Sequence, residues 1–207
     1  MQNIKYIILT IILSSLLISC SREGEEQEII ATLFRDEICK AKIDTIRNND
    51  GTIKEINSYR MVDTVVIQDL AGDSSNLYFD QIEYNYLKLH SLKSLTFSLC
   101  KKIVEQNKKY KKLRKLNIPG VTFIYLTDDE KKKIFTGMRE GWEKFRIKYG
   151  EHSLCWVSRP AINLLGNMAI ITFGNLYDGT SGGGTLYLLR KISGKWVVVE
   201  QVGTWVS

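Results

Sequence analysis

The sequence predicts an α+β protein in which about three helices pack on one face of a mostly antiparallel sheet. The C-terminal segment, residues 154–207, has the pattern of four consecutive strands in a meander, rich in Val, Leu, Tyr and Trp and interrupted by glycine-containing turns. The segments before it carry apolar residues at helical spacing. A hairpin alone is barely stable, so the strands need a cover, and these helices are available to supply it.

Composition limits the class of protein. The chain has 207 residues, of which 44% are hydrophobic, enough for one ordinary core. Two prolines and fifteen glycines exclude a collagen-like or disordered chain. The formal net charge of +6 would raise nucleic acid as a partner. No recognition motif accompanies the charge and the N-terminus directs export, so we expect no nucleic-acid partner.

Residues 1–19 are predicted to be an export signal. Lys5 is the only charge, and Tyr6–Leu17 is an apolar run of about a dozen residues, too short to span a membrane. The run ends in Leu17-Ile18-Ser19-Cys20, which resembles the bacterial lipobox. That resemblance implies cleavage before Cys20, diacylglycerol on its thiol and acylation of the new amino group. Several acyl chains anchor a protein stably where one does not.

The lipobox also sets the expected domain organisation. Residues 20–27 become a lipidated tether, and residues 28–207 form a single α+β domain with residues 120–207 as its core. The resemblance implies a lipid-anchored protein of the bacterial cell envelope, on the outer membrane and either periplasmic or surface-exposed. The membrane is then its first partner. The alternative is an ordinary secretory signal with a chance cysteine.

The first helix is predicted from Glu25 to Ile46, because Ile30 and Phe34 begin an apolar stripe at helical spacing. Asn48-Asn49-Asp50-Gly51 is predicted to end it as a plain turn. A calcium loop would need an acid where Ile46 stands, so the loop is not a calcium site.

A strand is predicted over Val62–Leu70, whereas Leu77–Tyr86 leaves strand and helix open. The second helix is predicted from Lys88 to about Lys115. Its second half is strongly basic and is a candidate surface for an anionic partner, such as lipid headgroups or a phosphorylated or acidic glycan; the alternative is a solvated helix face. The candidate residues in it are Lys108, Lys109, Lys111 and Lys112.

A short strand is predicted over Val121–Leu126, and Thr127–Glu130 is a capping box that opens a third helix continuing to Tyr149. Gly150 stands where a left-handed residue ends a helix. One face of this helix carries a stripe that we expect to pack on the sheet; a pocket lined by it is the alternative. The stripe consists of Phe135, Met138, Trp142, Phe145 and Tyr149.

The four predicted strands of the meander are Cys155–Asn163, Met168–Asn175, Thr185–Ile192 and Lys195–Ser207. Ser193-Gly194 is typical of a hairpin turn. Pro160 lacks an amide, so its strand lies at an edge or bends there.

Gly182-Gly183-Gly184 leads into a strand and is not a P-loop. It predicts a β-bulge or a close backbone approach, with amides exposed to a ligand as the alternative. A buried arginine in the first strand would need an acidic partner. Candidate binding residues on the sheet and its loops are Arg159, Asn163, Asp178, Gly182 and Gly183.

The chain offers no convincing catalytic or metal set. Two histidines, His90 and His152, and the cysteines after Cys20 have no metal-ligand spacing, so we expect no metal and no cofactor. His152 precedes Cys155 by three residues, but no third group is identified to orient the pair. We assign no catalytic residue and favour a protein that is not an enzyme. Whether any of Cys39, Cys100 and Cys155 pair stays open.

A resemblance covers residues 120–207. It rests on Gly141-Trp142, Phe145, Tyr149, Ser158-Arg159-Pro160, Asn163, Gly182-Gly183-Gly184, Gly194-Lys195-Trp196 and Trp205-Val206-Ser207. This pattern resembles a group of uncharacterised bacterial exported proteins and lipoproteins, from which no activity transfers. Helices followed by four strands and a Gly-x-Trp hairpin also resemble, in topology, the nuclear transport factor 2 fold. That superfamily includes enzymes and binding modules, so its fold leaves function open.

Two hypotheses for function follow. The favoured one is a lipid-anchored envelope module, not an enzyme, that binds a protein or an anionic glycan or lipid. The alternative is a small hydrolase or isomerase with a pocket between the third helix and the sheet. A filled core and a basic surface would favour the module, whereas a deep cavity with convergent polar groups would favour the enzyme.

Overall fold

The computed structural model describes residues 22–38, 45–47, 53–56, 64–71, 84–85, 87–88 and 92–206. Several expectations lie outside these residues: the export signal, Cys20, Cys39, the turn 48–51, His90 and most of the segment 77–86. Among the described residues, no helix is both long enough and apolar enough to cross a membrane.

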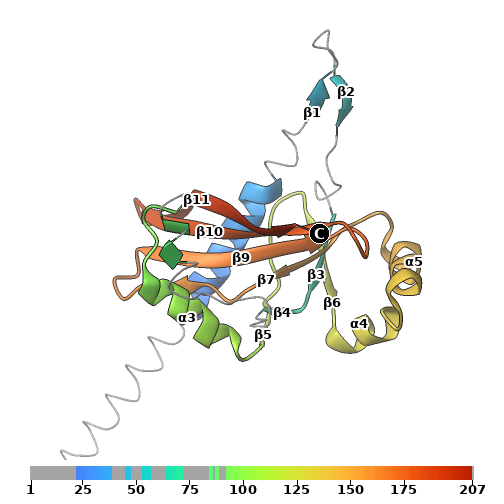
Figure 1. Ribbon diagram of the computed structural model, residues 1–207, viewed down its shortest axis with the longest axis horizontal. Coiled ribbons are helices and arrows are strands. Elements are labelled where there is room, and N and C mark those ends of the chain that lie inside the picture. The colour runs from blue at the N-terminus through green and yellow to red at the C-terminus, as the bar shows by residue number, and fades with distance from the viewer. Residues whose placement is uncertain are drawn as a thin grey trace, which may run out of the picture.

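A mixed seven-stranded sheet lies at the centre of the fold, in the order β11-β10-β9-β7-β3-β6 with β8 beside β9 (Figure 1). Neighbouring strands are antiparallel, except that β3 runs parallel to both β6 and β7. The strands are β3 (Thr64–Gln68), β6 (Thr122–Leu126), β7 (Leu154–Val157), β8 (Ala161–Ile162), β9 (Met168–Leu176), β10 (Gly182–Ile192) and β11 (Lys195–Val206). The prediction of an α+β fold with a mostly antiparallel sheet is confirmed.

Two small two-stranded sheets stand beside it. One pairs β1 (Thr45–Arg47) with β2 (Ile53–Ile56), and the other pairs β4 (Leu70–Ala71) with β5 (Lys111–Lys112). The first pair corrects the sequence analysis, because the first helix was expected to continue through Ile46. Residues 22–38 are helical, and the chain is a strand at Thr45–Arg47.

The C-terminal meander is present, with its first strand divided into β7 and β8 around Pro160, as the missing amide of proline predicts. At the break, the Oγ of Ser158 accepts a hydrogen bond from the Thr172 amide at 2.9 Å. The turn between β10 and β11 is also confirmed. Ser193 and Gly194 have φ of 50° and 81°, and two positive values are what a type I′ hairpin turn requires.

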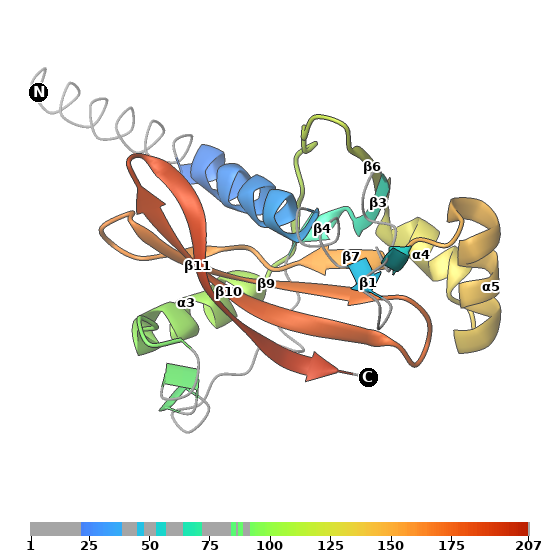
Figure 2. The same cartoon turned by 90° about the horizontal axis from the view of Figure 1, so that it is seen from above.

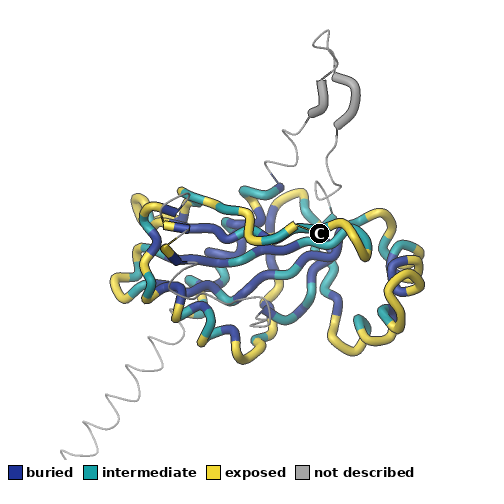
Figure 3. The backbone as a smooth tube through the Cα atoms, viewed as in Figure 1, coloured by how far each residue is buried: buried dark blue, intermediate teal, exposed yellow. Residues whose placement is uncertain are grey.

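Helices cover both faces of the sheet, so the expectation that they lie on one face is wrong (Figure 2). The helical segment 22–38 buries Phe34 against Phe173 on one face. Helix α3 (Phe97–Asn107) buries Ile103 against the face that carries Ile170. Successive strand residues point to opposite faces, so β9 packs against the helices on both sides of the sheet. Figure 3 shows the centre of β9 as buried.

The second predicted helix is too long, because α3 ends at Asn107 and Lys111–Lys112 form β5. The reason is where the apolar side chains must go. Leu99 of α3 packs on one face of the sheet, whereas Leu113 and Leu116 pack with the segment 22–38 on the other. The chain must therefore leave the helix and cross to the second face.

The third predicted helix is divided into α4 (Asp128–Ile134) and α5 (Met138–Tyr149). Phe135 folds back at the break, and its ring lies 5.1 Å from that of Trp142, measured between centroids. A Cβ on Gly141 would lie 2.9 Å from the Phe135 Cα, so this close approach needs a glycine.

The ends of the predicted helix are nevertheless confirmed. Thr127 accepts a hydrogen bond from the Glu130 amide at 3.2 Å, and Gly150 has a φ of 76°. The aromatic stripe packs on the sheet as expected, except that Met138 is 71% exposed.

Candidate functional site

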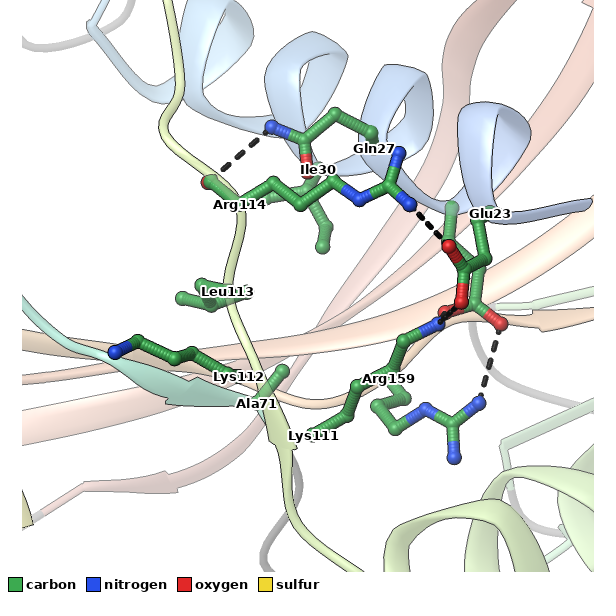
Figure 4. Close-up of a pocket in the computed structure, with 10 residues that line it drawn as sticks. Glu23, Gln27, Ile30, Ala71, Lys111, Lys112, Leu113, Arg114 and Arg159 are labelled. Atoms are coloured by element: carbon green, nitrogen blue, oxygen red, sulfur yellow. Dashed lines mark hydrogen bonds and ion pairs between the residues drawn. The ribbon is translucent and has the colours of Figure 1, made fainter. Parts of the chain in front are cut away.

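Charged side chains from four parts of the chain meet where the segment 22–38 begins. They line a surface pocket of about 380 Å³, which we call the cationic pocket. Its lining residues are Arg22, Glu23, Glu26, Lys102, Gln106, Lys111 and Arg159. A smaller hollow adjoins it between the same helical segment and β5 (Figure 4). The pocket thus joins the start of the described chain to α3, β5 and the break between β7 and β8.

Arg159 is the most firmly held of the cations. The buried Asn107 side chain accepts a hydrogen bond from the Arg159 amide at 2.6 Å and donates one to the Arg159 carbonyl at 3.0 Å. The guanidinium donates to the Gln106 carbonyl at 3.3 Å and to Glu26 Oε1 at 3.2 Å. The side chain is only 21% exposed, so the sequence-based condition, that a buried arginine needs an acid, is met by Glu26.

Glu23 and Glu26 are three residues apart, so they lie on one side of the helical segment. Lys111 Nζ is 3.0 Å from Glu23 Oε1 and 3.4 Å from Glu26 Oε2, and the Arg114 guanidinium also bonds to Glu23. The hydrogen bond and the charge of Lys111, followed by the charge of Arg114, lower the pKa of Glu23. The Glu23 carboxylate is therefore charged at neutral pH.

The part of the predicted tether that the structure describes, residues 22–27, is helical and bonded to the folded domain. Beside the ion pairs of Glu23 and Glu26, the Gln27 amide donates to the carbonyls of Arg114 and Lys115 at 3.3 and 3.2 Å. Figure 4 shows the bond from Gln27 to the Arg114 carbonyl, which joins the helix to the extended segment that follows β5. The start of the helical segment is thus fixed to the domain.

The pocket carries more positive than negative charge. Four cationic and two anionic side chains line it, a surplus of two positive charges. Within the described residues, neither Arg22 nor Lys102 has a carboxylate within ion-pair distance; Lys102 Nζ donates to the Ile162 carbonyl. Burial lowers the pKa of Lys102, and the charge of Arg22 lowers it further. An anion between the two would relieve this repulsion.

Two polar atoms at the edge of the pocket are also unsatisfied. Gln106 Oε1 and Arg159 Nε are buried and have no hydrogen-bond partner. Most buried polar atoms in proteins have one, so such exceptions mark places where a further group can bind.

Of the basic candidates predicted from the sequence, only Lys111 joins Arg159 in the pocket. Lys108 pairs with Glu105 at 2.6 Å on the surface and is 57% exposed. Lys109 and Lys112 are exposed, and Lys112 lines the adjoining hollow. The four lysines do not share one helix face, because α3 ends before the first of them.

Asn163 and Asp178 shape turns. Asn163 Oδ1 accepts from the amides of Asn167 and Met168 at 3.0 and 3.2 Å. Asp178 Oδ1 accepts from the Thr180 amide at 2.7 Å, and this bond is the largest cause of the lowered pKa of Asp178.

Gly182 and Gly183 are the first residues of β10, and Gly183 pairs with strands on both sides. The predicted bulge lies between Gly184 and Thr185 on the pairing with β11. The predicted close backbone approach is found at Gly182, where an added Cβ would lie 2.6 Å from the Asn175 carbonyl oxygen. The close neighbour of Gly184 is instead the Trp205 side chain. These glycines therefore serve the packing of the sheet.

Three features that an enzyme could use are missing from the described residues. Burial, followed by the negative charge of Glu37, raises the pKa of the Cys155 thiol, so it stays protonated and is a poor nucleophile. The space between α4–α5 and the sheet is filled by buried side chains, among them Trp142, Phe145 and Leu154. Nowhere in the described part of the chain do three or more His, Cys, Asp or Glu residues lie close enough to hold a metal.

Most of the pocket was not predicted from the sequence, namely Arg22, Glu23, Glu26, Lys102 and Gln106, and neither was Asn107, which holds the backbone of Arg159. One signal was available. Glu23 and Glu26 continue the helical spacing of Ile30 backwards, so they could have been placed on the helix. The positions of Lys102 and Asn107 opposite Arg159 follow only from the fold.

Comparison with protein-family models, with curated proteins and with solved structures finds no match. The case for function therefore rests on the geometry of the cationic pocket.

Proposed function

We propose that the protein is a lipid-anchored module of the bacterial cell envelope that binds an anionic partner and is not an enzyme. One observation carries the proposal: a pocket with surplus positive charge is built around Arg22, two residues after the predicted lipid attachment at Cys20. An anchor at that position would bring the pocket and the membrane together.

The reach of the chain supports this. Two residues of fully extended chain span at most about 7 Å. The helical segment 22–38 packs on the domain through the buried side chains of Ile29, Leu33 and Phe34, so the domain is not free to move away on a flexible linker. A lipid on Cys20 therefore holds the cationic pocket at the level of the headgroups.

The charges support an anionic partner. A basic residue close to an anionic membrane surface contributes about 1 kcal/mol of attraction, and salt screens it over the Debye length. Acyl chains already supply stable attachment. The pocket is thus expected to select a partner or an orientation.

The anchor is tested by metabolic labelling with a fatty acid and by membrane fractionation of the full chain. The wild type should carry label and sediment with membranes, and Cys20→Ala should lose both properties. Ser21→Ala, a change of similar size next to it, should keep them. Label that persists in Cys20→Ala would refute lipidation at this residue.

The anionic partner is tested separately, with the full chain in a non-ionic detergent applied to a resin that carries an acidic polysaccharide. We expect retention at low salt and elution as salt rises, with no retention on the uncharged resin. Equal behaviour on both resins at low salt would contradict the proposal.

A further inference from the structure

We infer that the cationic pocket binds the phosphate group of an anionic lipid headgroup, and that Glu23 pairs with Lys111 in its place when phosphate is absent. The inference rests on the function proposed above and gives it a ligand. Four cations on separate elements converge there: Arg22 and Lys102, which have no acid partner in the described chain, and Lys111 and Arg159, which have one.

The donors match a phosphate. Guanidinium groups present paired N–H donors in a plane that fits two oxygens of a phosphate, and ammonium groups add point charges. The surplus of two positive charges suits a group that carries one or two negative charges. Arg159 is held through its backbone by Asn107, so one guanidinium is already in place before a ligand arrives.

Of the four cations, Lys102 has the environment that a bound anion would stabilise most. Its ammonium is partly buried and bonded to the Ile162 carbonyl, and Arg22 is the neighbouring charge that acts on it. Two like charges at one pocket raise the free energy of the empty site, and a bound phosphate between them removes that cost.

Glu23 acts as an internal anion. Lys111 and Glu23 are each 34% exposed, and ion pairs at such exposure contribute at most about 1 kcal/mol. A phosphate that reaches Lys111 can therefore displace the Glu23 carboxylate. Glu26, whose side chain is only 10% exposed, stays paired with Arg159, because breaking a buried ion pair is costly. Neutralising Glu23 should strengthen phosphate binding, whereas on a general basic surface any nearby glutamate would have the same effect.

A headgroup is the favoured source of the phosphate, because of position. If Cys20 carries lipid, Arg22 lies within about 7 Å of the anchored residue, at the depth of the headgroup layer. A soluble phosphate would have to compete with headgroups present at far higher local concentration.

The test uses the full chain in a maltoside detergent, which contains no phosphate. Calorimetric titration with water-soluble short-chain phosphatidylglycerol measures headgroup affinity, and titration with inorganic phosphate forms the second arm. We expect Lys102→Gln to weaken headgroup binding by about three- to tenfold. Lys101→Gln is the matched control: it is the adjacent residue on α3, lies over the Phe97 ring and does not line the pocket.

Neutralising Glu23 is expected to have the opposite effect on headgroup affinity. Glu23→Gln should bind the headgroup about threefold more tightly. Glu28→Gln, an exposed glutamate on the same helical segment outside the pocket, should change nothing. Arg22→Gln, at an exposed position, repeats the loss without risk to the core, and thermal unfolding of every variant confirms that it folds.

The outcomes separate the two proposals. Equal weakening by Lys102→Gln and Lys101→Gln would overturn the pocket and leave general anion binding standing. If the headgroup affinity of Glu23→Gln is unchanged or lower, Glu23 is not an anion that phosphate displaces. Inorganic phosphate bound as tightly as phosphatidylglycerol would overturn the headgroup assignment. If the chain binds no phosphatidylglycerol and is also not retained on the acidic resin at low salt, the proposed function itself is refuted.

Discussion

Two glycines beneath a pair of stacked indoles allow a sharp test of how the sheet is packed. Trp156 of β7 pairs with Gly174 of β9, which pairs with Gly184 of β10, which pairs with Trp205 of β11. The two indole rings stack above the glycines with centroids 5.7 Å apart and planes 9° from parallel. A Cβ on Gly184 would lie 2.6 Å from Trp205 Cδ1 and 2.8 Å from Cε2.

The size of the effect of Gly184→Ala follows from these distances. Trp205 Nε1 is the atom nearest to the added Cβ, and carbon atoms pack at about 3.5–4.0 Å, so the Trp205 ring must move by more than about 1 Å. Overpacking of this kind costs about 1–3 kcal/mol, and a disturbed aromatic stack about 0.5–1.5 kcal/mol. We therefore expect Gly184→Ala to destabilise the protein by about 1–3 kcal/mol, which lowers its Tm by about 2–12 °C.

Thermal unfolding followed by circular dichroism and tryptophan fluorescence measures the loss. Gly203→Ala is the matched control, because it lies on β11 with open space around its Cα and no positive φ. In a Trp205→Ala background, Gly184→Ala should cost almost nothing, since the atoms it strikes are gone. The reasoning is wrong if Gly184→Ala has the same Tm as Gly203→Ala. It is also wrong if Gly184→Ala lowers stability as much in the Trp205→Ala background as in the wild type.

Two further predictions concern single residues. Asn107→Ala should lower the free energy of unfolding by about 1–3 kcal/mol, because it leaves the amide and carbonyl of Arg159 without partners; urea unfolding against exposed Asn117→Ala measures this. The hydrogen bond from Lys148 lowers the pKa of Glu130, so this pair stabilises fully above the ordinary glutamate pKa of about 4.3 and the contribution is lost as pH falls through the lowered value. Glu130→Gln should therefore flatten the acid limb of a stability-against-pH curve, and an unchanged limb would contradict this.

The sheet could be predicted from the sequence because its signals are local. The Ser193-Gly194 turn, the β-branched runs around it and Pro160 each act on their own neighbours. The helices were predicted less well where tertiary packing decides. Leu113 continues an apolar pattern that fits α3, yet it packs on the opposite face of the sheet, and only the path of the whole chain reveals this.

The pocket shows the same division between local and distant information. Arg159 could be singled out from the sequence, together with the condition that a buried arginine needs an acidic partner. Its partner Glu26 is 133 residues away, so no spacing rule connects them. Lys111 was proposed for its charge, and the structure gives that charge a position beside Glu23.

The proposed exchange of Glu23 for phosphate raises the question of whether the helical segment would then leave the domain. The energies indicate that it stays. The exposed ion pairs of Glu23 contribute at most about 1 kcal/mol each. Ile29, Leu33 and Phe34 are completely buried, and burial of such a side chain contributes about 1.5–3 kcal/mol. Apolar contact therefore holds the helix, which leaves the Glu23 carboxylate free to exchange with a ligand while the fold around the pocket is unchanged.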